Sequence, residues 1–79
     1  MRGFNLDQLQ TFVDVIAHGS FSAAAERLNV SQPAVSLQIR QLEKRLGVRL
    51  IERVGKRATP TPAGAELLRH ARQIDQLVT

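Results

Sequence analysis

The chain has 79 residues, no Cys and a formal net charge of +4 at pH 7, which leaves room for one small domain and excludes disulfides and thiolate metal sites. Its apolar runs fall short of the roughly 18 residues of a membrane span, and its N-terminal segment lacks the continuous apolar core of a signal peptide. We therefore expect a cytoplasmic protein without membrane contact, whose thin helical core is assisted by an oligomeric partner.

Apolar residues at helical spacing predict a first helix that begins at Leu6. Asn5 can cap its start, Gln8 stands where a capping box places its second member, and Gly19 is a C-terminal stop. The predicted buried stripe consists of Leu6, Leu9, Phe12, Val13 and Ile16. We interpret these residues as core.

A second, shorter helix is predicted over residues 23–28, with Ser22 as its N-cap. The next three residues, Asn29-Val30-Ser31, interrupt the helical pattern. Asn tolerates the left-handed conformation of a tight turn, and Ser31 can cap a following helix. We therefore expect a turn of only three or four residues.

The third helix is predicted to begin close to Gln32, because Pro33 is tolerated only in the first turn of a helix. Gly47 is the expected C-terminal stop. The buried stripe of this helix would consist of Val35, Ile39, Leu42 and Leu46. Its opposite face is polar and basic.

Two helices joined by so short a turn predict a helix-turn-helix over residues 21–40, whose second helix enters the major groove of DNA. The spacing of Ala25, Asn29 and Val35 fits two helices that cross closely. An ordinary antiparallel helical hairpin is the alternative that the pattern leaves open. The basic segment that follows favours the helix-turn-helix.

Positive charge gathers in residues 40–57, where seven cations against two carboxylates leave a net charge of +5. Such a patch on a small domain is typical of a protein that binds a polyanion, although a basic face can also serve solubility alone. Residues 48–60, which overlap this segment, predict a two-stranded wing with a turn around Gly55. Its cations are Arg53, Lys56 and Arg57. We interpret them as contacts to phosphates or to the minor groove.

The last predicted helix spans residues 62–79, with Thr61 as N-cap and Pro62 at the first helical position. Spacings of four, three and four define an apolar seam of the coiled-coil type. The seam consists of Leu67, Ala71, Ile74 and Val78. We expect the first turns to pack on the domain and the later turns to pair with a second copy of the chain.

The pattern LxxFVxVIAxGSFSAAAERLNVSQPAVSLQIRQLEKRLGVRLIER, continued by TPTPAG, resembles the N-terminal DNA-binding domain of a LysR-type transcriptional regulator over essentially the whole chain. The resemblance implies a mainly α fold, with a winged helix-turn-helix of three helices and a two-stranded wing at residues 1–61. A linker and dimerisation helix follows at residues 62–79. It further implies sequence-specific binding of double-stranded DNA by a homodimer on an inverted repeat, and the full-length regulator can form a tetramer. A small-molecule inducer is expected to bind a separate C-terminal domain, so we expect no cofactor in this chain.

Carried over position by position, the resemblance assigns base readout to Gln32, Pro33, Ser36 and Leu37. We expect backbone or minor-groove contacts from Ser22, Ser31, Arg40, Arg53, Lys56 and Arg57. Many members of the family have Arg where this chain has Leu37, which offers apolar contact, for instance to a thymine methyl group, in place of two hydrogen bonds to guanine. Lys56 likewise stands where Arg is frequent, which weakens any inference of minor-groove insertion.

Two other classes of function compete with DNA binding. An enzyme has little support, because Cys is absent and His18 and His70 lie at the ends of different predicted helices without a nearby carboxylate cluster. We therefore predict no enzyme and no metal site. A helical protein-interaction module would use the last helix to bind a partner and the basic face only for solubility. Salt-dependent binding to duplex DNA separates this module from a DNA-binding domain.

Overall fold

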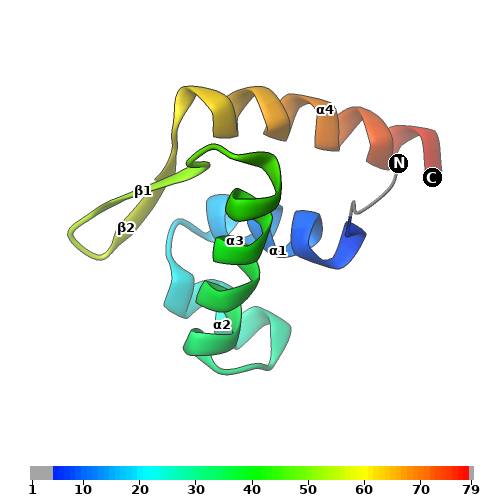
Figure 1. Cartoon of the computed structure of the whole chain (residues 1–79). Coiled ribbons are helices and arrows are strands. Elements are labelled where there is room, and N and C mark those ends of the chain that lie inside the picture. Colours follow the sequence, from blue (N-terminus) through cyan, green and yellow to red (C-terminus); the bar gives the residue numbers. More distant parts are fainter. Residues whose placement is uncertain (1–4, 79) are drawn as a thin grey trace.

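The computed structural model describes residues 5–78, with the side chains of residues 5–73, as helices joined by short turns and one hairpin (Figure 1). In chain order the elements are α1 (Leu6–His18), α2 (Phe21–Leu28), α3 (Gln32–Leu46), β1 (Ile51–Val54), β2 (Arg57–Pro60) and α4 (Pro62–Val78). The predicted mainly α winged helix-turn-helix with a long final helix is thus confirmed.

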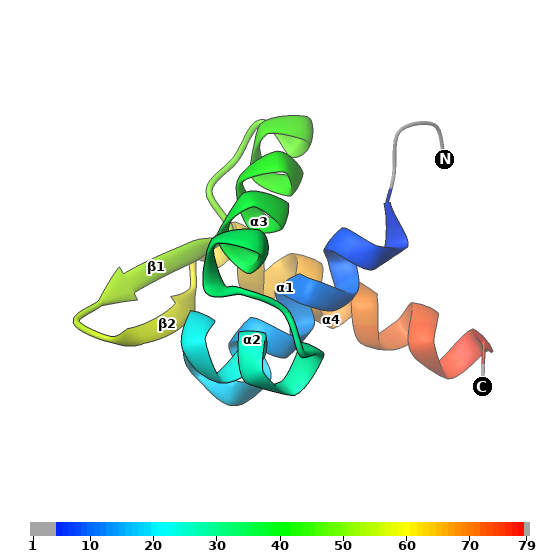
Figure 2. The same ribbon diagram turned by 90° about the horizontal axis from the view of Figure 1, so that it is seen from below.

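Helix α1 lies in the middle of the molecule, with α2 and α3 on one side and α4 across the other (Figure 1). The hairpin β1–β2 projects to one side, and the C-terminal end of α4 points to the opposite side, as the view turned by 90° also shows (Figure 2). The core lies between these layers. Its largest fully buried side chains are Phe12, Val15, Val35, Leu42 and Leu50.

The start of α1 confirms Asn5 as its cap, because the Asn5 Oδ1 accepts hydrogen bonds from the backbone N–H of Asp7 and of Gln8. The predicted capping box is wrong. Gln8 is buried, and its Nε2 donates to Gln41 Oε1 on α3 at 3.0 Å, so the side chain joins two helices. Leu6 was also misplaced in the core, since 64% of its surface is exposed in the first turn of the helix.

Helix α2 begins two residues earlier than the pattern predicted, and its N-cap is Ser20 rather than Ser22. The Ser20 Oγ accepts a hydrogen bond from the backbone N–H of Ala23 at 3.0 Å. The earlier start places the Phe21 ring in the core, with 8% of its surface exposed. Asn29 adopts the predicted left-handed conformation, with φ of 59°, and ends the helix.

Helix α3 begins and ends as predicted. The Ser31 Oγ accepts a hydrogen bond from the Ala34 N–H, Pro33 lies in the first turn, and Gly47 closes the helix. Val35, Ile39 and Leu42 are buried, but Leu46 is 40% exposed and does not belong to the core. The reason is that residues 44–49 are all exposed, so none of the elements that the structure describes covers the last turn of this helix.

The wing is the antiparallel hairpin β1–β2, in which Ile51 pairs with Pro60 and Val54 with Arg57. Gly55 has a φ of 64° at the first of the two turn positions, where a type II′ turn requires glycine. The first strand begins at Ile51 rather than at residue 48. Glu43 on α3 accounts for the later start. Its carboxylate accepts hydrogen bonds from the backbone N–H of Leu50, at 2.7 Å, and of Ile51, at 3.2 Å.

The N-terminus of α4 is fixed to the segment that precedes β1. Thr61 caps it as predicted, since its Oγ1 accepts a hydrogen bond from the Gly64 N–H at 3.0 Å. The same hydroxyl donates to the Arg49 carbonyl at 2.6 Å. Leu67 is half-buried against the core, and Ala71 is a member of it with 7% of its surface exposed. These two residues of the predicted seam therefore contact the chain's own domain.

The other two residues of the seam, Ile74 and Val78, lie outside the residues whose side chains are described. The pairing of two copies of the chain through α4 stays a prediction.

Candidate nucleic-acid interface

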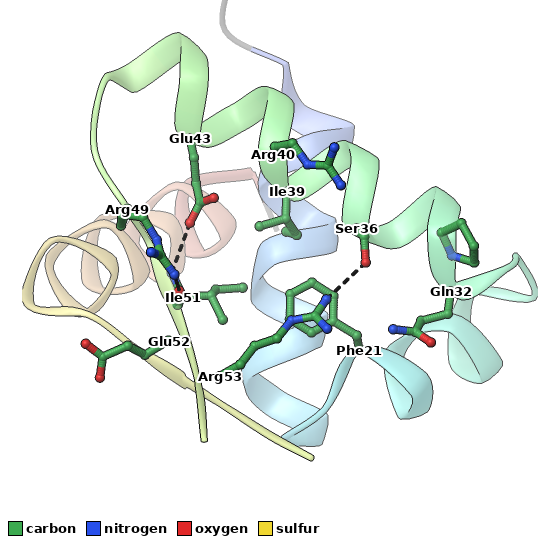
Figure 3. A pocket seen from close by; sticks show the side chains of 11 residues that line it. Phe21, Gln32, Ser36, Ile39, Arg40, Glu43, Arg49, Ile51, Glu52 and Arg53 are labelled. Atoms are coloured by element: carbon green, nitrogen blue, oxygen red, sulfur yellow. Dashed lines mark hydrogen bonds between the residues drawn. The ribbon is translucent and has the colours of Figure 1, made fainter. Parts of the chain in front are cut away.

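A groove of about 610 Å³ runs between α3 and β1 (Figure 3). Three of the four predicted base-reading residues, Gln32, Pro33 and Ser36, line its α3 side. Arg53 lines its β1 side, and its guanidinium lies over the Phe21 ring of α2. We call this hollow the readout groove. The fold thus brings the start of α3 and the first strand of the wing to one surface.

The exposed face of α3 follows helical spacing. Pro33, Ser36, Leu37 and Arg40 stand at positions i, i+3, i+4 and i+7, which lie on one side of a helix. Leu37 is 51% exposed on this face, so its apolar side chain is open to contact from a partner. Ser31 is exposed as well, and its hydroxyl oxygen serves as the cap of α3. This face is the surface that α3 offers to a partner.

A second hollow of about 400 Å³ adjoins the readout groove between the start of α2 and the tip of the wing. Ser22, Lys56 and Arg57 line it, together with Gln32 and Arg53. The predicted backbone-contacting residues therefore lie beside the predicted base-reading residues. Ser22 is exposed in the first turn of α2, where helix N–H groups favour an anion.

Cations around the two hollows lack partners of opposite charge. Arg40, Arg49, Arg53, Lys56 and Arg57 are all exposed. In the part of the chain that the structure describes, none of these five forms an ion pair with a carboxylate. Glu43 lies among them, but its carboxylate accepts two backbone N–H bonds at the start of β1. The surface therefore carries uncompensated positive charge.

Sequence reasoning missed three contributors to this surface. Phe21 and Glu43 carry no local signal, because their roles depend on the approach of β1 to α2 and α3. Arg49 belongs to the basic segment but was not singled out, and it lines the groove with its Nη2 donating to the Ile51 carbonyl at 3.4 Å. Only the charge clustering could have indicated Arg49.

Glu52 is exposed and also lines the readout groove. The ion pairs that the structure shows lie on α4, outside the groove. On α4, a hydrogen bond from Arg69 lowers the pKa of the exposed Glu66 carboxyl, and His70 adds a weaker bond. Among residues 5–78 the structure shows no group of three His, Cys, Asp or Glu side chains that could hold a metal ion. The helices in that range are also too short or too polar to cross a membrane.

The chain has a helix-turn-helix, α2 and α3, whose second helix is exposed, and a basic two-stranded hairpin lies beside that helix. These features define the class of winged helix-turn-helix proteins. Residues 6–65 match the family described as "Bacterial regulatory helix-turn-helix protein, lysR family". The chain belongs to this family.

Named relatives agree with this assignment. The chain is 49% identical over 72 residues to the RuBisCO operon transcriptional regulator of Allochromatium vinosum, a match that covers 91% of this chain and 24% of that protein. It is 50% identical over 74 residues to the HTH-type transcriptional regulator CfxR of Cupriavidus necator, with 94% and 23% covered. The chain thus spans about a quarter of the length of these relatives.

Solved structures give the same result. The DNA-binding domain of CbnR in complex with DNA superposes with a TM-score of 0.88 at 41% sequence identity, covering 95% of this chain and 86% of that one. The DNA-binding domain of BenM in complex with benA site 1 DNA gives a TM-score of 0.84 at 37% identity, covering 95% and 92%.

Proposed function

We propose that this chain is the DNA-binding domain of a bacterial LysR-type transcription regulator and that it recognises specific duplex sequences. One observation carries the proposal: an exposed α3 face and five cations without ion pairs border the same groove. Two solved neighbours similar over most of this chain are themselves complexes with DNA. The domain acts by binding without catalysis, in the cytoplasm where bacterial DNA lies.

In this proposal α3 enters the major groove, where Gln32, Pro33, Ser36 and Leu37 face base edges. The wing cations Lys56 and Arg57, together with Arg53, Arg40 and the hydroxyls of Ser22 and Ser31, contact the backbone or the adjacent minor groove. In the whole regulator, a small-molecule inducer binds a separate C-terminal domain, as the resemblance to the family implies. The identity of the operator then follows from selection of bound sequences from random duplex DNA.

Gln32→Ala is expected to weaken binding to the selected sequence by about 1–3 kcal/mol and binding to random duplex DNA much less, because Gln can form two hydrogen bonds with adenine. Fluorescence anisotropy titrations on both duplexes measure the difference. Gln41→Ala is the matched control, since this α3 amide contacts Gln8 on the α1 side of the helix. Equal losses on both duplexes would reassign Gln32 to backbone positioning.

Ile74→Asp is expected to abolish dimers in sedimentation and to weaken binding to a full inverted repeat while sparing a single half-site. Leu67 and Ala71 contact the chain's own core, so we place the pairing of two copies in the later turns of α4. The new carboxylate at residue 74 would be desolvated in the paired helices, opposite the same carboxylate of the second copy. Gln73→Asp, at an exposed position of α4, is the matched control. Equal loss on both kinds of site would show that Ile74 supports the fold of the domain.

A further inference from the structure

Arg53 joins three elements, unlike the other two cations of the wing. Its Cζ lies 3.8 Å from the centroid of the Phe21 ring, at the start of α2. Its Nη2 donates a hydrogen bond to the Ser36 Oγ on α3 at 3.1 Å (Figure 3). The guanidinium therefore lies across the readout groove, between the wing and the helix face that meets the bases.

The Phe21 ring beneath the guanidinium and the backbone of Arg53 are both held in place. The Phe21 ring is fixed by burial in the core, and the backbone of Arg53 pairs in the hairpin with the buried Ala58. A guanidinium is planar, so it can stack on an aromatic ring while its edge N–H groups donate to a neighbour. An ammonium group at this position would keep the charge but would lose the stacked geometry.

The bond from Arg53 constrains the hydroxyl of Ser36. A Ser hydroxyl has one hydrogen to donate and two lone pairs that accept. The Arg53 N–H occupies a lone pair, and the positive charge of the guanidinium repels the hydroxyl hydrogen. The hydrogen is therefore turned away from Arg53. Ser36 lines the readout groove, so its remaining donor is available to a group that enters there.

We infer that Arg53 is a positioning residue for sequence readout: it holds the Ser36 hydroxyl as a hydrogen-bond donor toward the base edge. This inference rests on the proposed function. The expected targets are the acceptors of the major groove, namely guanine N7 and O6, adenine N7 and thymine O4. The donor groups at cytosine N4 and adenine N6 are disfavoured at that step. Arg53 thereby contributes to the choice of base, in addition to the attraction that its charge exerts on phosphates.

The contact can be tested without DNA. The ring current of Phe21 should shift the δ and ε proton resonances of Arg53 upfield in the nuclear magnetic resonance spectrum of the free chain. Phe21→Leu keeps an apolar side chain in the core and should return these resonances to ordinary values. Arg57, on the same hairpin, should show no such change. Ordinary Arg53 resonances in the wild-type chain would overturn the inference.

The effect on readout is tested by a double-mutant cycle on DNA. Selection with the wild type and with Ser36→Ala first identifies the base step at which their preferences differ. The ratio of affinities for the preferred and the substituted base is then measured for Arg53→Lys, Ser36→Ala and the double variant. Each single variant should lower this ratio about 3- to 10-fold, the contribution of one hydrogen bond, and the double variant should lose no more than Ser36→Ala alone.

The outcomes separate this inference from the proposed function. Arg53→Lys keeps the positive charge, so its affinity for random duplex should fall by a smaller factor than its affinity for the preferred sequence. Arg69→Lys makes the same exchange on α4, outside both hollows, and is the matched control that should leave the ratio unchanged. An unchanged ratio for Arg53→Lys, or additive losses in the double variant, would overturn the inference while the proposed function stands. A wild-type chain that binds duplex DNA without discrimination would overturn both.

Discussion

Replacing Gly64 by Ala is expected to lower the free energy of unfolding by about 3 kcal/mol, at the upper end of the cost of overpacking. A Cβ on Gly64 would lie 2.0 Å from the Leu50 carbonyl oxygen and 3.0 Å from its carbon. Both are backbone atoms, so no flexible side chain can move aside. The N-terminus of α4 would have to separate from the start of the wing.

Helix propensity acts in the opposite direction at this position. Ala favours a helix over Gly by about 1 kcal/mol, and Gly64 lies in the first turn of α4. The steric clash should dominate, because separation would also strain the hydrogen bond from the Thr61 N–H to the Leu50 carbonyl, 3.0 Å long, and the cap at Thr61. For a domain of this size the midpoint of thermal unfolding should fall by roughly 15 °C.

Denaturation monitored by circular dichroism measures this loss. Ala65→Gly, at the next and exposed position, is the matched control and should cost only about 1 kcal/mol through propensity. A Gly64→Ala variant more stable than the wild type would show that the contact between α4 and Leu50 relaxes without cost.

The helices were predictable because local chemistry marks their ends. Ser31, Pro33 and Gly47 delimit α3 where the sequence indicated. The start of α2 was not predictable in the same way, because Ser20 and Ser22 are equally good caps. Burial of Phe21 decides between them, and that depends on the packing of the whole core.

The composition of the candidate site was predictable in part. Charge clustering and the turn before α3 placed its cations and its exposed helix face on the correct elements. The contacts of Arg53 with Phe21 and Ser36 were not predictable, since they join residues 32 and 17 positions apart that only the folded wing brings together. Glu43 is a similar case, because its bonds to the wing backbone depend on tertiary structure.

Raising the salt concentration from about 50 to about 200 mM is expected to lower the affinity of the dimer for duplex DNA by about 10³. We take three of the five exposed cations around the two hollows to neutralise phosphates in each protomer. A dimer then releases counterions from about six phosphates, and the logarithm of its affinity falls with the logarithm of the salt concentration with a slope near −5. Titrations at four or five salt concentrations measure the slope directly. The loss should be similar for the selected and for random duplexes, because phosphate contacts carry no sequence information.

Lys56→Ala should make this slope shallower by about one unit per protomer, because each phosphate contact contributes about one unit. Arg69→Ala removes a cation that is already ion-paired with Glu66 on α4, and it should leave the slope unchanged. A slope near zero in the wild type would contradict the proposed function. The basic face would then serve solubility, and a module that binds a protein partner through α4 would become the better interpretation.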